Sequence, residues 1–274
     1  MRILITGHKG QLGRALQARW PSATGVDLPE VNITEAGAIE SIVAEQRPEV
    51  IVHCAAMTDV DGAARDPQAA YHANGLGTQN VALAAARAGA ALVYISTNEV
   101  FDGTKGAPYL EFDTPNPLNP YAASKRAGEW FTAQLTRQFF IIRTSWLTGR
   151  GGRNFVHRIL QLADEKGRLS VVTDEIANPT FVDDLADGIV QLVGSGRFGI
   201  YHLTNAGYCS RYDYARHILD ASGRGQIPVD AITLADYPRL STPPKFSPLA
   251  NQAAAALGIT LRPWQAALAE FLKA

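Results

Sequence analysis

The chain has 274 residues, of which 46% are hydrophobic and 19% are charged, and its formal net charge is −1. These values are typical of a globular protein, and they argue against the basic patch that a nucleic acid or an anionic membrane surface requires. The sequence has no apolar run long enough to cross a bilayer and no segment with the features of a signal peptide, so we expect a cytoplasmic protein without nucleic-acid or membrane partners.

The first half of the chain alternates short apolar runs with segments of helical periodicity. The predicted strands are residues 2–6, 23–26, 49–56, 90–96 and 139–145. The predicted helices are residues 10–20, 34–47, 66–88 and a segment that begins after Asn119. Strands that are apolar on both faces indicate a parallel sheet covered by helices on both sides. The predicted fold class is therefore α/β, with a Rossmann-like doubly wound parallel sheet.

The pattern changes near residue 150, where the strands become shorter and less regularly spaced. The predicted elements are helices at residues 154–165, 183–193 and 211–222, strands at residues 169–173 and 199–203, and a closing helix at residues 263–274. We predict a Rossmann domain over residues 1–150 and a smaller C-terminal α/β lobe for substrate over residues 151–274. This lobe is expected to be partly discontinuous, with some segments returning to the sheet.

A glycine-rich loop follows the first predicted strand. It reads TGHKGQLG, in which Gly7, Gly10 and Gly13 are spaced as GxxGxxG. Glycines permit a tight turn and a close approach of the backbone to a ligand, and the next helix directs free N–H groups at a pyrophosphate. A glycine triplet between a strand and a helix is typical of dinucleotide binding. We expect five loop residues to bind the cofactor: Gly7, Gly10, Gln11, Leu12 and Gly13.

The end of the second predicted strand carries two conflicting signals about the cofactor. Asp27 stands where an acid accepts hydrogen bonds from the adenosine ribose, which favours NADH. His8, Lys9 and Arg14 are cations close to the place that the 2′-phosphate of NADPH would take. The sequence therefore leaves both NADPH and NADH as candidate cofactors.

A tyrosine and a lysine share one face of the helix that Asn119 is expected to cap. The segment NPYAASKRAGEW places Tyr121 and Lys125 four residues apart. A phenol has a pKa of about 10 and exchanges protons poorly at neutral pH, but a nearby ammonium group lowers that pKa. We therefore expect Lys125 to lower the pKa of Tyr121 and to bind the nicotinamide ribose.

Together these motifs resemble the extended short-chain dehydrogenase/reductase superfamily and, more closely, the dTDP-4-dehydrorhamnose reductase family. The resemblance is carried by TGHKGQLG, VHCAAMTDVD, NGLGTQN, STNEVFDG, YAASKRAGE, RTSWLTG, DEIANPT and PWQAALAEFL. These segments span nearly the whole chain. The resemblance implies an NAD(P)H-dependent reduction of the C4 ketone of a nucleotide-activated deoxysugar, with dTDP-4-dehydrorhamnose as the first candidate. It leaves a monomer or a homodimer open.

The resemblance also implies roles for individual residues. The implied catalytic residues are Thr97, Tyr121 and Lys125, with Thr97 bonding the C4 oxygen beside Tyr121. The implied cofactor contacts include Ala55, Ala56, Thr58 and Asn74, the last of which is expected to hold Lys125 or a water. The implied substrate contacts are Thr97, Asn98, Glu99, Trp146 and Asn154. The only cysteines, Cys54 and Cys209, are too few for a metal-binding cluster, so we expect no metal site.

Three positions depart from the pattern of the resembled family. Two of them lie in STNEVFDG, where the family usually reads STDYVFDG. Asn98 replaces an acid and Glu99 replaces a tyrosine, so Glu99 admits proton abstraction at C5 of the sugar, as in a dehydratase or an epimerase. Asn98 argues against dehydration, because an amide cannot protonate a leaving hydroxyl. Pro243 stands where the family carries an arginine, and Lys245 is the alternative cation for the diphosphate.

A further hypothesis from another class is a non-catalytic NAD(P)-binding regulatory subunit. The fold alone does not exclude it. The presence of Thr97, Tyr121 and Lys125 argues against it, since a binding module has no use for a proton donor.

Overall fold

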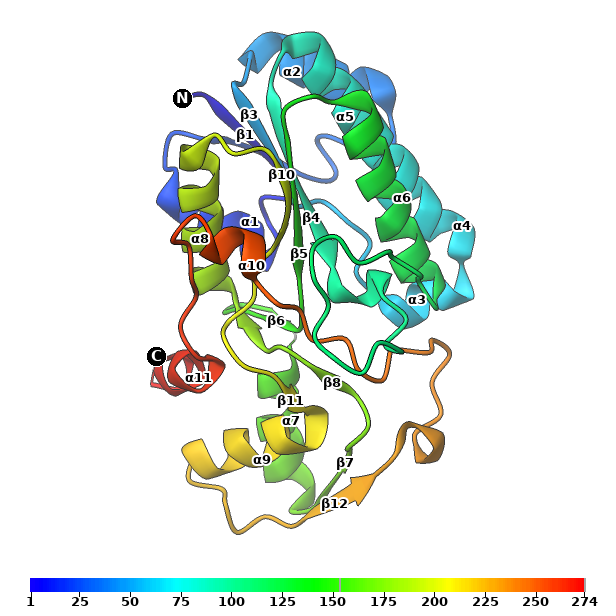
Figure 1. The fold of residues 1–274 in the computed structure, drawn as a ribbon, viewed down its shortest axis with the longest axis vertical. Helices are drawn as coiled ribbons and strands as arrows, with labels where there is room; N and C mark the ends of the chain where they lie inside the picture. Colours follow the sequence, from blue (N-terminus) through cyan, green and yellow to red (C-terminus); the bar gives the residue numbers. More distant parts are fainter. Residues whose placement is uncertain (153, 274) are drawn as a thin grey trace.

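A computed structural model describes residues 1–152 and 154–273, and it confirms the predicted α/β class (Figure 1). Six parallel strands form one sheet in the order β10-β5-β4-β3-β1-β2. The strands are β1 (Ile3–Thr6), β2 (Thr24–Val26), β3 (Val50–His53), β4 (Ala91–Thr97), β5 (Phe139–Thr144) and β10 (Gly199–His202). The chain order reverses between β1 and β3, and ligands of doubly wound sheets bind at the carboxyl ends of such neighbouring strands.

Helices cover both faces of this sheet, which explains why its strands are apolar throughout. One face carries α1 (Gln11–Arg19), α8 (Val182–Ser195) and α10 (Gln252–Ala255), and the other carries α2 (Ala36–Gln46), α5 (Gly77–Ala88) and α6 (Pro120–Leu135) (Figure 1). Leu16 and Ile189 are fully buried in the first layer, and Ile39 and Val81 are fully buried in the second. Each layer therefore has its own hydrophobic core.

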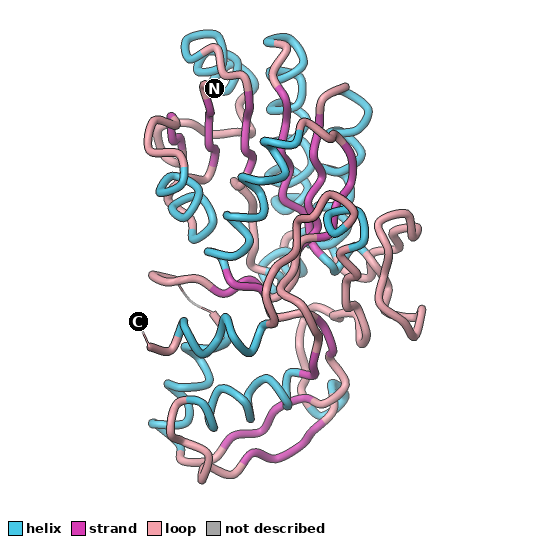
Figure 2. The backbone as a smooth tube through the Cα atoms, turned by 60° about the vertical axis from the view of Figure 1, so that its left-hand side comes forward, coloured by secondary structure: helices cyan, strands magenta, loops and turns pink. Residues whose placement is uncertain are grey.

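After residue 150 the chain crosses more than once between the sheet and a smaller lobe (Figure 2). The lobe contains α7 (Phe155–Lys166), β7 (Leu169–Val172), α9 (Arg211–Ala221), β12 (Val229–Ile232) and α11 (Trp264–Phe271). The chain returns to the sheet with α8 and β10. The division at residue 150 stays a prediction, and residue 274 of the predicted closing helix lies outside the described residues.

Short elements connect these parts. They are α3 (Val60–Arg65), α4 (Pro67–Ala70), the π-helix η1 (Tyr71–Leu76), the 3₁₀ turns η2 (Asn98–Val100) and η3 (Leu234–Asp236), β6 (Leu147–Thr148), β8 (Ile176–Ala177), β9 (Thr180–Phe181) and β11 (Cys209–Ser210).

The helical stretch predicted over residues 66–88 is present from Pro67 to Ala88, but it is not α-helical throughout. The segment consists of α4, η1 and α5, with the π-helix in the middle. The reason is Asn74, whose side chain is turned inward and is 1% exposed. Its amide accepts a hydrogen bond from Met57 N at 2.8 Å and donates one to Ser124 Oγ at 2.9 Å. Wide turns of this kind are rare and occur mostly at functional sites.

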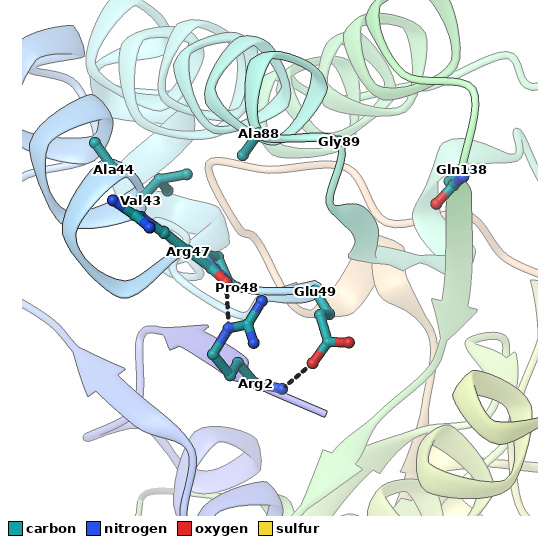
Figure 3. A pocket seen from close by; sticks show the side chains of 9 residues that line it. All are labelled: Arg2, Val43, Ala44, Arg47, Pro48, Glu49, Ala88, Gly89 and Gln138. Carbon is teal, nitrogen blue, oxygen red and sulfur yellow. Dashed lines mark hydrogen bonds between the residues drawn. The ribbon is translucent and has the colours of Figure 1, made fainter.

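A pocket of about 480 Å³ lies at the amino edge of the sheet, opposite the carboxyl ends of the strands (Figure 3). Its arginine Arg2 is already engaged. The backbone nitrogen of Arg2 donates to Glu49 at 2.7 Å, and its Nε donates to the carbonyl of Arg47 at 2.7 Å. This pocket shares no residue with the motifs of the sequence, so the candidate site is sought at the other edge.

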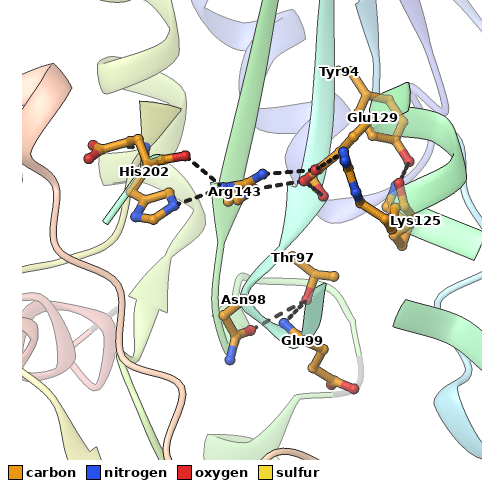
Figure 4. Close-up of polar contacts among 11 residues, drawn as sticks. Tyr94, Thr97, Asn98, Glu99, Lys125, Glu129, Arg143 and His202 are labelled. Carbon is orange, nitrogen blue, oxygen red and sulfur yellow. Dashed lines mark hydrogen bonds and ion pairs between the residues drawn. The ribbon is translucent and has the colours of Figure 1, made fainter. Parts of the chain in front are cut away.

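A buried ion pair joins β4, β5 and α6 near the carboxyl edge (Figure 4). The guanidinium group of Arg143 donates two hydrogen bonds to the Glu129 carboxylate, at 2.8 and 2.9 Å. Ser96 Oγ donates a third to the same carboxylate at 2.7 Å. Glu129 is 0% exposed and Arg143 is 1% exposed. These bonds fix α6 to the two strands beneath it.

We predict that Arg143→Ala lowers the free energy of unfolding by about 3–5 kcal/mol, because it takes from the buried Glu129 carboxylate its buried cation and two hydrogen bonds, and leaves only the partly exposed Arg126 at 3.2 Å. Urea unfolding measures this loss. The double variant Glu129→Leu, Arg143→Met is expected to be more stable than Arg143→Ala, since it removes both charges. Arg168→Ala, which breaks an ion pair with Asp230 on the surface, serves as the control and should leave stability unchanged. An Arg143→Ala variant as stable as this control would contradict the argument.

Candidate active site

The glycine loop at the carboxyl end of β1 has a shape that only glycines permit. Gly7 has a φ of 71°, and a Cβ atom there would lie 2.5 Å from the backbone nitrogen of Ala55. A Cβ atom on Gly13 would lie 2.3 Å from the carbonyl oxygen of Gly7. Gly10 is the N-cap of α1 and makes no side-chain cap bond, so the first N–H groups of the helix face the loop. This cradle fits a dinucleotide pyrophosphate.

Asp27 and Lys9 lie side by side at the end of β2. The Asp27 carboxylate accepts hydrogen bonds from the backbone nitrogens of Lys9 and Leu28, at 2.9 and 2.8 Å. The Lys9 ammonium donates to the Leu28 carbonyl and pairs with Glu30, both at 2.8 Å. The acid and the cation that give conflicting signals in the sequence are therefore neighbours beside the glycine loop.

The loop after β3 packs on the glycine loop and is held from the other side by Asn74. Ala55 touches Gly7, as the close approach of their backbones shows. Asn74 clamps Met57, between Ala56 and Thr58, through hydrogen bonds of 2.8 and 3.0 Å. Its remaining bond goes to Ser124, the residue before Lys125. Asn74 therefore joins the loop to α6 through Ser124, which the sequence analysis did not single out.

Thr97 and Tyr121 meet at the carboxyl end of β4. Thr97 ends the strand and is 7% exposed, and Tyr121 lies in the first turn of α6. The side chain of Asn119 caps that helix at Ala122 N, at 2.8 Å, as the sequence predicts. Burial and the nearby Glu99 carboxylate raise the pKa of Tyr121, and a hydrogen bond with Thr97 opposes this rise. The phenol therefore keeps its proton at neutral pH.

Lys125 lies against the aromatic ring of Tyr94. Its ammonium nitrogen lies 4.3 Å from the centroid of the Tyr94 ring. Burial lowers the pKa of Lys125 to about 7, although the Glu129 carboxylate opposes the shift. Burial is the largest influence on Tyr121, and it raises the pKa of the phenol in this structure. The expected influence of Lys125 on that pKa stays a prediction.

Asn98 and Glu99 point to different partners. Asn98 is 4% exposed and donates to Ser247 Oγ at 2.7 Å. Glu99 accepts a hydrogen bond from Asn119 Nδ2 at 2.8 Å. Burial raises the pKa of Glu99, and the Asn119 hydrogen bond opposes the rise. Glu99 thus stands at the N-terminus of α6 close to Tyr121, whereas Asn98 supports the loop that contains Ser247.

Trp146 has a strained backbone and a cation stacked on its ring. Its φ of 41° is unusual for a bulky residue. The guanidinium carbon of Arg211 lies 3.6 Å from the centroid of the ring. Arg211 also donates to the buried carboxylate of Glu175 at 2.9 Å. The sequence analysis gave no role to Arg211 or to Glu175, although Glu175 lies in the DEIANPT motif, because the two residues pair across 36 positions.

Asn154 caps α7. Its side-chain oxygen accepts a hydrogen bond from His157 N at 3.0 Å, and its nitrogen donates to the Gly149 carbonyl at 2.8 Å. These bonds fix the turn after β6, on the same edge as Trp146. Its predicted contact with the sugar nucleotide stays a prediction.

Pro243 and Lys245 lie on a pocket of about 410 Å³ beside the site. The pocket is lined by Asp102, Gly103, Thr104, Leu118, Leu234, Tyr237, Pro238, Arg239, Ser241, Thr242, Pro243 and Lys245. Lys245 pairs with Asp174 at 3.1 Å, and its side chain is 70% exposed.

In residues 1–152 and 154–273 no three His, Cys, Asp or Glu side chains are grouped so that they could hold a metal ion. The same residues contain no helix long and apolar enough to span a membrane.

The Rossmann-type sheet, the glycine cradle and the Thr97, Tyr121 and Lys125 side chains at one edge define an extended short-chain dehydrogenase/reductase. The family described as "RmlD substrate binding domain" matches residues 1–274, and the chain belongs to it. The resemblance to the dTDP-4-dehydrorhamnose reductases is thereby confirmed.

Individual relatives agree over nearly their whole length. The chain is 39% identical to a dTDP-4-dehydrorhamnose reductase of Aggregatibacter actinomycetemcomitans, over 97% of each chain. It is 37% identical to the spore coat polysaccharide biosynthesis protein SpsK of Bacillus subtilis (strain 168), over 99% of this chain and 97% of the relative. A crystal structure of the dTDP-4-dehydrorhamnose reductase of Bacillus anthracis in complex with NADP superposes with a TM-score of 0.95, at 37% identity, over 100% of this chain and 99% of the other.

We predict that Lys125→Met raises the melting temperature of the cofactor-free protein. In the folded state the pKa of Lys125 is lowered to about 7, so the folded protein binds this proton less tightly than the unfolded chain does. Its burial therefore destabilises the fold fully below pH 7, and this cost disappears as the pH rises towards the unfolded pKa of about 10.4. Thermal melting across this range measures the difference. Lys166→Met, at the end of α7, is the control, and equal pH profiles for both variants would contradict the prediction.

Proposed function

We propose that the protein reduces the C4 ketone of a nucleotide-activated deoxysugar with NADPH or NADH, and that its substrate is dTDP-4-dehydrorhamnose. The observation that carries the proposal is the contact of Thr97 with the protonated Tyr121, at the same sheet edge as the glycine cradle. Membership of the family supports it, as does the NADP bound in the Bacillus anthracis relative. Cytoplasmic location, a monomeric or dimeric state and the lack of nucleic-acid partners stay predictions.

The residues of the chain divide the work of this reaction. When bound, the reduced nicotinamide supplies a hydride. We assign the proton to Tyr121, whose phenol donates it to the C4 oxygen as negative charge develops there. Thr97 orients the carbonyl through a second hydrogen bond, and Lys125 binds the ribose and adds positive charge near the oxygen. Binding both ligands at one edge holds the reacting groups in position.

The loops around this centre are assigned to the two ligands. Gly7, Gly10 and Gly13 cradle the pyrophosphate, with the loop that follows β3 beside them. Asp27 accepts hydrogen bonds from the adenosine ribose. We assign the ring of Trp146 to contact with the sugar. The Arg211 guanidinium group stacks on this ring and fixes the orientation of the ring.

We predict that Tyr121→Phe lowers kcat about a hundredfold or more, because it removes the proton donor and little else. The assay follows the consumption of NADPH or NADH with freshly prepared dTDP-4-dehydrorhamnose. KM should change little. Tyr201→Phe is the matched control, since its hydroxyl bonds the Arg197 carbonyl at the far end of β10. A Tyr121→Phe variant as active as this control would overturn the assignment.

A second candidate function rests on Glu99. Burial raises the pKa of this carboxyl group, and it lies beside Tyr121, so it has the properties of a base at C5 of the sugar. In a dehydratase or an epimerase the hydride would return to the sugar, and no reduced cofactor would be consumed. Asn98 is bound to Ser247 and carries no acidic proton, which argues against dehydration.

We predict that Glu99→Gln retains ketone reduction within about tenfold of the wild type, because the amide still bonds Asn119 and removes no proton that the reduction needs. Incorporation of deuterium from D₂O at C5 is measured in the same reactions, with Glu165→Gln as the control. Deuterium uptake by the wild type that requires Glu99, without loss of reduced cofactor, would instead establish the epimerase or dehydratase. Cofactor binding without either reaction would favour the regulatory subunit.

A further inference from the structure

The segment of residues 237–245, here called the bridging segment, passes over the candidate site (orange in Figure 1). Ser241 N donates to Asp61 Oδ1 at 3.2 Å, next to the start of α3. Thr242 O accepts a hydrogen bond from Asn119 Nδ2 at 3.2 Å, the same amide that holds Glu99. The bridging segment is thus attached to α3 and to the N-cap of α6, the helix that carries Tyr121.

Arg239, in the middle of this segment, lies between two carboxylates without bonding either closely. Its Nε is 3.9 Å from Asp61 Oδ1, and its Nη1 is 3.8 Å from Glu175 Oε2. Both distances exceed those of hydrogen bonds, and within the described part of the chain its guanidinium group makes none. Glu175 is already paired with Arg211 at 2.9 Å. The side chain of Arg239 is 24% exposed, so the donors of its guanidinium are available to a ligand.

Two further cations near the pocket, Arg211 and Lys245, are each engaged in an ion pair. Arg211 stacks on Trp146 and bonds Glu175. Lys245 pairs with Asp174 at 3.1 Å, and its side chain is 70% exposed. Lys245 also presents a point charge, whereas an arginine presents a planar fork that matches two phosphate oxygens.

Arg239 lines the pocket of about 410 Å³ that begins beside Asn119. That size suits a nucleotide. The pocket wall also carries the hydroxyl groups of Thr104 and Thr242 and the ring of Tyr237, which is 55% exposed. Hydroxyl groups, an aromatic ring and an arginine are the groups that bind sugars, bases and phosphates.

We infer that Arg239 binds the diphosphate of the sugar nucleotide, and that the nucleoside occupies the pocket bounded by Tyr237. This inference rests on the proposed function for the identity of the ligand. When the ligand binds, the Arg239 guanidinium group forms hydrogen bonds with two phosphate oxygens and gives up its long contacts with Asp61 and Glu175. Before the ligand binds, the Asp61 and Glu175 carboxylates hold the Arg239 side chain at the mouth of the pocket.

The test is calorimetric titration of dTDP into the protein saturated with oxidised cofactor. We expect Arg239→Ala to weaken dTDP binding about ten- to hundredfold, and Arg239→Lys to restore part of it. Arg168→Ala, which removes an exposed arginine of the lobe, should bind dTDP as the wild type does. Thymidine, which lacks phosphates, should bind Arg239→Ala and the wild type equally. If Arg239 only maintained the shape of the pocket, its loss would weaken the binding of thymidine as well.

Two results would overturn the inference: dTDP binding by Arg239→Ala that equals the wild type, or a loss of binding in Lys245→Ala alone. In the reductase assay the expected change is a raised KM for the sugar nucleotide with kcat within about threefold, because the reacting groups are untouched. Failure of the proposed function is distinguishable. Tight dTDP binding that depends on Arg239, in a protein that does not reduce the ketone, would uphold this site and reject the reaction.

Discussion

The buried carboxylate of Glu129 is the interaction on which the geometry of the site depends. It receives hydrogen bonds from β4 through Ser96 and from β5 through Arg143, and it belongs to α6. Thr97 follows Ser96 directly, and Tyr121 lies two helical turns before Glu129. The distance between the Thr97 hydroxyl and the Tyr121 phenol is therefore set by a charge network beneath them. A hydrophobic contact would leave more freedom, because it does not depend on direction.

Electrostatic balance distinguishes this site from a simple apolar pocket. Burial and the nearby Glu175 carboxylate raise the pKa of Glu99, whereas Arg239 and Arg211 lower it. Besides burial, the negative charge of the Glu99 carboxylate raises the pKa of Tyr121. The chemistry of this cleft is thus coupled to the protonation state of Glu99. An anionic ligand bound to Arg239 would neutralise one of the positive charges that stabilise the Glu99 carboxylate.

The sequence was sufficient for features that depend on local patterns. The glycine spacing predicts the cradle, and Asn119 is recognisable as a helix cap. The apolar runs predict strands at the positions of all six strands of the sheet, β10 included. Long-range pairs carry no such pattern. Glu129 lies in YAASKRAGE and Arg143 lies in RTSWLTG, but neither motif shows that these two side chains form a pair. The direction of Lys125 towards Tyr94 likewise follows from packing and not from spacing.

The π-helix has a consequence for how the chain tolerates change in length. Each residue of a helix turns the next by about 100° around the axis. Removal of one residue from Tyr71–Leu76 would let the segment continue as an α-helix, but it would rotate Asn74 away from Met57 and Ser124. Most single substitutions on the outer face of this segment leave that orientation intact. A deletion there would free the loop beside the glycine cradle, so the length of this segment is constrained more tightly than its composition.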